Sequence, residues 1–174
     1  MEEALGISLL EALDGQQLNC LNEDAEHTLK SILQSKQLNT SSNYLLSDAD
    51  EQLILNIPFN QVVRIRALVI KSAGEPEQRP RRIKLFVNRP TLGFEDAADA
   101  SEPEAAQIFE LTDEQVAEGK RIPLRFVRFQ SVNSLHIFVE SNGGDDQTRI
   151  DAIDVFGAQA QGTRDLSGLK VVED

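Results

Sequence analysis

The sequence predicts an all-β fold, a β-sandwich with one or two short N-terminal helices. Apolar and polar residues alternate with a period of two in seven or eight short segments after Tyr44. Helical spacing occurs only in short segments, and the chain has no strong internal repeat. Many short strands joined by turns, without long helices, are typical of a β-sandwich.

Two short helices are expected near the N-terminus. The apolar positions of Ile7–Leu13 recur at helical spacing, and Ser8 is a candidate cap. Leu29, Ile32 and Leu33 share one helical face, which predicts a second helix around residues 24–34. The polar residues 39–43 that follow predict a loop.

Three amphipathic strands come next, each with one apolar face. In the segment 53–59 every second residue is apolar, from Leu53 to Phe59. In the segment 63–70 we expect Val63, Ile65, Ala67 and Val69 on the core side. The segment 83–87 alternates in the same way. In the last two segments Arg64, Arg66 and Lys84 point to the other side, which predicts half-buried strands with a basic face exposed to solvent.

The second half of the chain returns to short strands after an acidic excursion. Residues 88–103 contain Pro90, Gly93 and four acids, which predicts a long surface loop. Thr112 and Gln115 have the spacing of a capping box. Further strands are expected at residues 108–111, 124–129, 134–140 and 150–156, with a Gly-Gly turn between the last two. We place an N-terminal extension at residues 1–17, one domain at 18–158 and a polar tail at 159–174.

Composition excludes several classes of function. The 174 residues carry a net charge of −12, which disfavours binding to DNA or anionic lipid and mildly favours a monomer. No segment reaches the ~18 apolar residues that span a bilayer. One Cys and two His are too few for a closed zinc site, and no cofactor motif occurs. The N-terminus lacks the basic region of a secretory signal, so we expect an intracellular protein.

Candidate catalytic groups are few. His136 lies in a strand, where a satisfied surface or rim histidine is a more common finding than a general base. Cys20 is followed by Glu23 and Asp24, which disfavour a thiolate, so a structural role is favoured over redox sensing. The acids of residues 47–51 are expected in a solvated turn, with weak calcium binding as the alternative. We therefore expect no enzyme and no metal site.

The feature most typical of a binding site is a group of basic residues. Residues 51–90 hold eight basic and three acidic residues. Arginine favours paired contacts with carboxylates, which suits an acidic protein partner. The alternative is that these basic residues only balance the charge of the acidic segments within the same fold and bind no partner. The candidate partner-binding residues are Arg64, Arg66, Arg81, Arg82, Lys84 and Arg89.

Ordered sequence blocks resemble a known family. The longest block is Pro123-Leu-Arg-Phe-Val-Arg-Phe-Gln-Ser-Val-Asn-Ser134. Shorter blocks lie at residues 20–23, 47–53, 59–61, 83–88, 94–96, 101–103, 137–139, 141–142, 148–150 and 156–157. In this order they resemble the PITH domain, whose name stands for proteasome-interacting thioredoxin. The blocks cover almost the whole expected domain.

The resemblance implies a jelly-roll β-sandwich that docks on the regulatory particle of the proteasome, in the cytoplasm and nucleus. In some members a thioredoxin domain precedes the module. Thioredoxin chemistry needs a C-x-x-C pair, which this chain lacks, so the resemblance implies a thioredoxin-like or stand-alone member without catalysis here. The alternative is a jelly-roll that binds a small molecule or glycan, a fold-level analogy. Trp is absent and Tyr44 is the single tyrosine, which disfavours sugar stacking.

Overall fold

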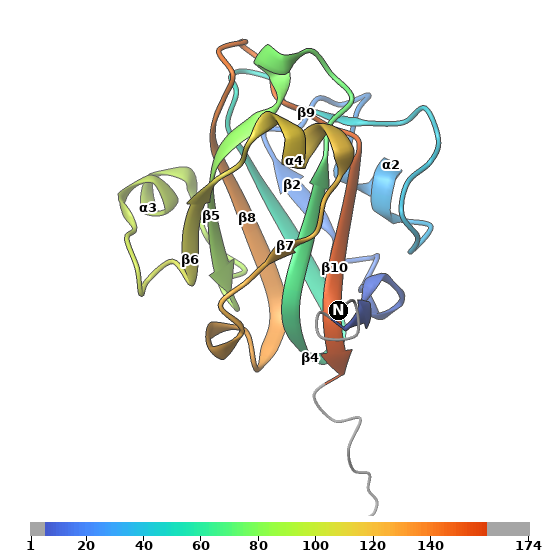
Figure 1. Ribbon diagram of the computed structural model, residues 1–174, viewed down its shortest axis with the longest axis vertical. Helices are drawn as coiled ribbons and strands as arrows, with labels where there is room; N and C mark the ends of the chain where they lie inside the picture. Colours follow the sequence, from blue (N-terminus) through green and yellow to red (C-terminus); the bar gives the residue numbers. More distant parts are fainter. Residues whose placement is uncertain (1–5, 160–174) are drawn as a thin grey trace, which may run out of the picture.

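The computed structural model describes residues 6–159 and confirms the all-β class (Figure 1). Most strands belong to a sheet of order β1-β10-β4-β8-β5-β6, while β2 and β7 also pair with β4, and β3 pairs with β9. The strands are β1 (Ile7–Ser8), β2 (Asn19–Leu21), β3 (Leu45–Leu46), β4 (Leu53–Lys71), β5 (Pro80–Val87), β6 (Gln107–Glu110), β7 (Ile122–Pro123), β8 (Val132–Asn142), β9 (Arg149–Ile150) and β10 (Ala152–Gln159).

The helices are short, as expected. They are η1 (Leu10–Ala12), α2 (Leu29–Leu33), η2 (Pro76–Gln78), α3 (Phe94–Asp99), α4 (Asp113–Glu118) and η3 (Phe126–Arg128). The predicted helix around residues 24–34 is confirmed as α2, and the capping box of Thr112 and Gln115 begins α4.

The N-terminal segment forms less helix than its spacing predicts. Ile7 and Ser8 pair with β10, and only residues 10–12 form a helical turn. Leu9, Leu10 and Leu13 are buried in the main core, although they precede the expected start of the domain at residue 18. The apolar side chains of this segment are removed from water by packing against the sheet, which stabilises the extended path of the segment.

The long strand β4 connects the two halves of the sandwich. Residues 53–58 and Val63 pair with β8, and residues 63–71 pair with β10. On the same strand, β2 pairs with residues 54–56 and β7 with Ala67 and Leu68. The main hydrophobic core therefore takes inward residues from both halves of one strand.

A bulge in β4 changes which residues face that core. Val63 and Ile65 point inward as predicted, but beyond Arg66 the inward residues are Leu68 and Ile70. Ala67 and Val69 instead pack with Phe156 on the opposite side, so their predicted inward orientation is wrong. The pairing with β10 shifts register between Phe156 and Gly157, and an extra residue in one strand moves every later side chain to the other face.

The outer face of β4, β8 and β5 carries a second apolar cluster. Ile54, Phe86 and Phe138 are fully buried there beneath residues of the 92–105 segment. This segment contains α3, which lies beside β5 and β6 (Figure 1). The segment 88–103, which we predicted as a long surface loop, therefore covers one end of a sheet face that we expected to be exposed to solvent.

Polar side chains hold the loops at one end of the sandwich. Asn22, whose φ is 70°, donates to the carbonyl of Gln52 and accepts from the amide of Ala49. Thr148 donates to the carbonyl of Glu51 and accepts from Asn142. The acidic loop 47–52 is therefore fixed from two sides. Across the described residues, no helix is both long and apolar enough to span a membrane.

Candidate interaction surface

The predicted basic residues do not form one patch. Arg64 and Arg66 are half-buried on β4, while Arg81, Arg82 and Lys84 lie on β5. Strand β8 separates β4 from β5 in the sheet. The two groups therefore belong to different parts of the surface.

The β5 residues are engaged within the fold. Arg81 forms a salt bridge with Asp113 at 3.2 Å, and Arg82 forms one with Glu140 at 2.8 Å. Lys84 is only 3% exposed, in contrast to its expected outward position. Its ammonium donates to the carbonyls of Ala97, Ala98 and Ala100 at 2.8–3.1 Å. The Lys84 ammonium therefore caps the C-terminal end of α3. It is inaccessible to a partner, because α3 folds over it. Arg89 is half-buried, with its guanidinium 5.8 Å from the centre of the Phe86 ring.

The longest family-like block forms a turn instead of the predicted strand over residues 124–129. The Leu124 amide donates to the carbonyl of Arg66, and the Ile65 amide donates to the carbonyl of Phe129, both at 2.9 Å. The residues between these two anchors leave the ladder and form η3. The predicted strand is wrong because the chain meets β4 at its two ends only.

This turn buries its ends and exposes its middle. Leu124 and Phe129 pack in the main core. Phe126 is 37% exposed and Val127 is 70% exposed. The Arg66 guanidinium lies 4.7 Å from the centre of the Phe126 ring, a cation–π contact between β4 and the turn.

Two further arginines flank the exposed pair. Arg125 forms a salt bridge with Glu102, and an Arg128 nitrogen lies 3.9 Å from the same carboxylate. The second Glu102 oxygen accepts from the Ile108 amide at 3.0 Å. This amide and the Arg125 guanidinium lower the pKa of Glu102, so the carboxylate stays charged. We call Arg66, Arg125, Phe126, Val127 and Arg128 the Phe126 surface.

The sequence contained a signal for this turn. Arg125 and Arg128 lie three residues apart, and so do Phe126 and Phe129. A spacing of three fits a 3₁₀ turn better than a strand. Sequence reasoning named Arg66 but missed the two exposed apolar residues and the role of Glu102.

A second candidate site is a chain of hydrogen-bonded polar side chains, which we call the polar chain: Asn19, Asn56, His136 and Ser134. Asn19 is exposed, and the other three are buried. Asn56 donates to Asn19 Oδ1 at 2.9 Å, so its own Oδ1 faces His136 Nδ1 at 2.6 Å. His136 Nδ1 must then carry the proton, and Nε2 accepts from the Ser134 hydroxyl at 2.8 Å. The order serine, imidazole, carboxamide resembles a nucleophile with its base. These residues line a cavity of 150 Å³ together with Gln17, Pro58 and Pro90.

The electrostatics of the polar chain favour a structural role. His136 is 1% exposed, not at a rim as expected. Burial and the nearby Arg89 lower the pKa of His136 to about 4. A general base works best with a pKa near the working pH, so this imidazole is poorly suited to activate Ser134 at neutral pH. The polar chain satisfies buried hydrogen-bonding groups instead.

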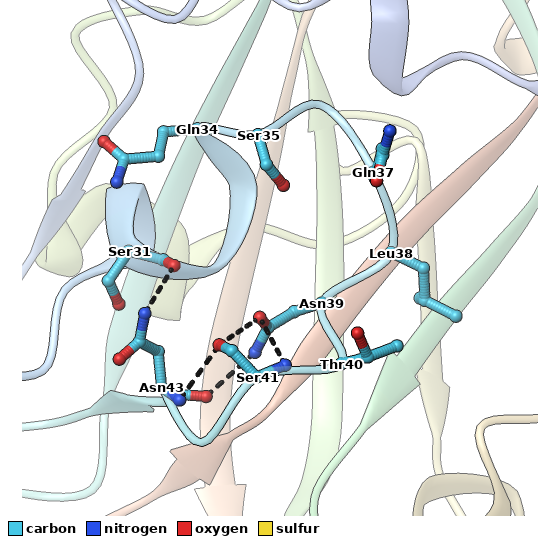
Figure 2. Close-up of a pocket in the computed structure, with 9 residues that line it drawn as sticks. All are labelled: Ser31, Gln34, Ser35, Gln37, Leu38, Asn39, Thr40, Ser41 and Asn43. Atoms are coloured by element: carbon cyan, nitrogen blue, oxygen red, sulfur yellow. Dashed lines mark hydrogen bonds between the residues drawn. The ribbon is translucent and has the colours of Figure 1, made fainter.

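A third candidate is an open pocket of 260 Å³ beside α2 (Figure 2). Its lining is uncharged and consists of Ser31, Gln34, Ser35, Gln37, Leu38, Asn39, Thr40, Ser41 and Asn43. Figure 2 shows Asn39, Ser41 and Asn43 bonded to one another, so much of the lining polarity serves the loop itself. The following residue, Tyr44, is stacked by His27 at 4.1 Å and by Arg149 at 3.9 Å. Both faces of its ring are covered and cannot support a sugar.

The remaining candidate groups are the Cys20 thiol and the acidic side chains. Cys20 is buried, and burial together with Glu23 raises the pKa of its thiol well above the usual value. A protonated, buried thiol agrees with the structural role and disfavours redox sensing. Within residues 6–159, no cluster of three His, Cys, Asp or Glu side chains is arranged to hold a metal ion.

Comparison with known proteins supports the family resemblance. The family model described as PITH domain matches residues 1–174. The chain is 41% identical over 153 residues to Thioredoxin-like protein 1 of Schizosaccharomyces pombe, covering 86% of this chain and 51% of that protein. It is 34% identical over 164 residues to PITH domain-containing protein 1 of Danio rerio, covering 94% of this chain and 75% of that protein. The chain thus spans about half the length of the yeast relative.

Solved structures identify the fold as a jelly-roll β-sandwich. The CBM32-1 and CBM32-2 domains of Clostridium perfringens ZmpB, in complex with GalNAc, match with a TM-score of 0.62 and 7% identity, over 91% of this chain and 38% of that one. A Streptococcus pneumoniae fucose binding module matches with a TM-score of 0.52 and 10% identity, over 82% of this chain and 93% of that one. Similarity at this level of identity concerns the fold alone.

Proposed function

Because the chain belongs to the PITH domain family, we propose that it is a non-catalytic module that docks on the regulatory particle of the proteasome through the Phe126 surface. It acts as a thioredoxin-like or stand-alone PITH protein, as a monomer, in the cytoplasm and nucleus. The family supports a role in protein–protein interaction. The choice of surface rests on the structure.

The exposure of Phe126 and Val127 carries this choice. Other family-like blocks have tasks inside the fold, since Asn22 and Thr148 hold loops. Phe126 and Val127 lie in the longest block, yet their side chains reach solvent. Exposed aromatic and arginine side chains side by side are typical of the residues that dominate protein interfaces.

A glycan-binding function has less support. The glycan-binding modules share only the fold with this chain, and both faces of Tyr44 are already covered. The uncharged pocket beside α2 offers Leu38 as its apolar residue and no aromatic ring. The family match favours the interaction module.

The test is retention of purified proteasomes on the immobilised chain, at low and at moderate salt. We expect the wild type to retain them, and the double variant Phe126→Ser, Val127→Ser to lose about tenfold or more in affinity. The matched control is Leu38→Ser, which removes an apolar side chain that is 46% exposed elsewhere. It should leave retention unchanged.

Two results would contradict the proposal. A wild-type chain that retains no proteasomes at either salt concentration would refute docking by this module. A double variant that binds as tightly as the wild type, with unchanged circular dichroism, would refute the Phe126 surface.

A further inference from the structure

Arg89 is one of the predicted basic residues, and it differs from its neighbours on β5 in its ion pairs. Arg81 and Arg82 form salt bridges with Asp113 and Glu140. Over residues 6–159, no Asp or Glu side chain forms a salt bridge with Arg89, although its side chain is half-buried. A partly desolvated guanidinium without a counter-charge is unfavourable, and a bound carboxylate would supply that charge.

Arg89 lies beside the cavity of 150 Å³ that the polar chain lines. The next residue along the chain, Pro90, is part of the cavity lining. The Arg89 guanidinium lies 5.8 Å from the centre of the Phe86 ring, and Phe86 pairs with His136 between β5 and β8. Burial and the charge of Arg89 lower the pKa of His136, so the positive field of Arg89 reaches the cavity.

Asn88 attaches this turn to the strand that supplies part of the cavity lining. Its φ is 60°, its amide donates to the carbonyl of Ser134 at 2.9 Å, and its Oδ1 accepts from the Ser134 amide at 3.1 Å. Ser134 and His136 both line the cavity. The backbone at Arg89 is therefore positioned before a ligand binds, which lowers the entropic cost of binding.

The cavity lining is uncharged and offers both donors and acceptors. The side-chain amide of Gln17 forms no hydrogen bond with the part of the chain that the structure describes. Ser134 donates its proton to His136, which leaves lone pairs of its oxygen as acceptors. Asp14, the acid nearest to Gln17 in sequence, does not line the cavity and accepts from the Gln16 amide. The lining therefore contains no carboxylate that would repel an anion.

We propose that Arg89 and this cavity form a binding site for the C-terminal carboxylate of a partner polypeptide. Arg89 pairs with the carboxylate, Gln17 donates to it, and the Ser134 oxygen accepts from the last peptide N–H of the partner. A chain end brings one backbone segment to a cavity of this size, whereas an internal Asp or Glu brings two. The site goes beyond the proposed function, because it shares no residue with the Phe126 surface.

The test is fluorescence anisotropy with three peptides of equal length, each labelled at its N-terminus. The first ends in Gly-Ala-Ala with a free carboxylate, and the second has the same sequence with an amidated end. The third has an amidated end and carries its carboxylate on an internal Glu. We expect the first peptide to bind about tenfold more tightly than the other two, because only its terminal carboxylate fits beside Arg89.

Arg89→Gln should weaken binding of the first peptide about tenfold, because it removes the charge that pairs with the carboxylate. The matched control Arg64→Gln makes the same change at a half-buried position of β4 that does not line the cavity. It should change the affinity less than about twofold. Circular dichroism checks that both variants keep the fold.

A pH titration of the His136 ring by NMR tests where the peptide binds. A carboxylate in the cavity offsets the charge of Arg89 and favours the imidazolium form, so we expect binding to raise the pKa of His136 above about 4. An unchanged pKa in the complex would overturn the use of this cavity.

The other outcomes are equally decisive. Equal binding of the free and the amidated peptide, no binding of the free peptide, or unchanged binding by Arg89→Gln would overturn the carboxylate site. Equal binding of the peptide with the internal Glu would overturn the assignment to a chain end. None of these results bears on the Phe126 surface, which is tested by the retention of proteasomes.

Discussion

The polar chain and the Phe126 surface reverse the usual distribution of polar and apolar side chains. In the polar chain, Asn56 and His136 are 7% and 1% exposed. On the Phe126 surface, Phe126 is 37% exposed and Val127 is 70% exposed. The two regions share one sequence block, since residues 123–134 contain both Phe126 and Ser134.

Internal hydrogen bonds explain why the polar chain can be buried. Each member of the polar chain has a hydrogen-bond partner inside the protein, so burial costs little and the arrangement fixes how β2, β4 and β8 meet. Phe126 gains a cation–π contact with Arg66, but Val127 is 70% exposed. The exposure of this pair beside arginines is the observation on which the proposed docking function depends.

The largest expected effect separates two phenylalanines of the same turn. Phe129 is fully buried in the main core, and Phe126 is 37% exposed. We expect Phe129→Ala to lower the free energy of unfolding by about 3–5 kcal/mol, because it leaves a cavity. Phe126→Ala should cost about 1 kcal/mol or less. Urea denaturation measures both, and similar losses would mean that the turn packs as a unit and that Phe126 is structural.

The second prediction concerns the polar chain and pH. The pKa of His136 falls from 6.5 to about 4 in the folded protein. The folded state therefore binds fewer protons than the unfolded state between these two pH values. The contribution of neutral His136 to the free energy of unfolding is complete above pH 6.5 and is lost as the pH falls toward 4. A shift of this size corresponds to about 3 kcal/mol.

The matched variant for this prediction is His136→Gln, which cannot titrate. Other groups titrate in both proteins, so the difference between the two curves isolates His136. From pH 7 to pH 4, the wild type should lose about 3 kcal/mol more unfolding free energy than the variant. Parallel losses in the two proteins would show that His136 is not buried as a neutral ring.

The elements that the sequence predicted correctly are those set by local pattern. The inward positions of Leu53, Leu55, Ile57 and Phe59 follow from a period of two and are confirmed. The helix α2 and the capping box of α4 follow from spacing within one turn and are also confirmed.

The errors come from contacts between distant segments. The bulge at Arg66 depends on pairing with β10, about ninety residues later. Lys84 alternates like a surface residue, but α3 folds over it and uses its ammonium as a cap. For the site, the composition indicated arginines. It could not indicate the exposed apolar pair, because that exposure depends on how residues 124–129 attach to β4 at both ends.

The smallest effect is expected at the outer end of the polar chain. Asn19 is exposed on β2 and accepts from Asn56 at the edge of the cavity. Asn19→Ala removes one hydrogen bond, and water can reach the freed Asn56 donor, so we expect a loss of about 1 kcal/mol in urea denaturation. The control Asn133→Ala, at an exposed position on β8, should stay within about 0.5 kcal/mol of the wild type. A loss at Asn19 as large as that at Phe129 would mean that the polar chain carries the fold as the apolar core does, and the contrast between the two regions would fail.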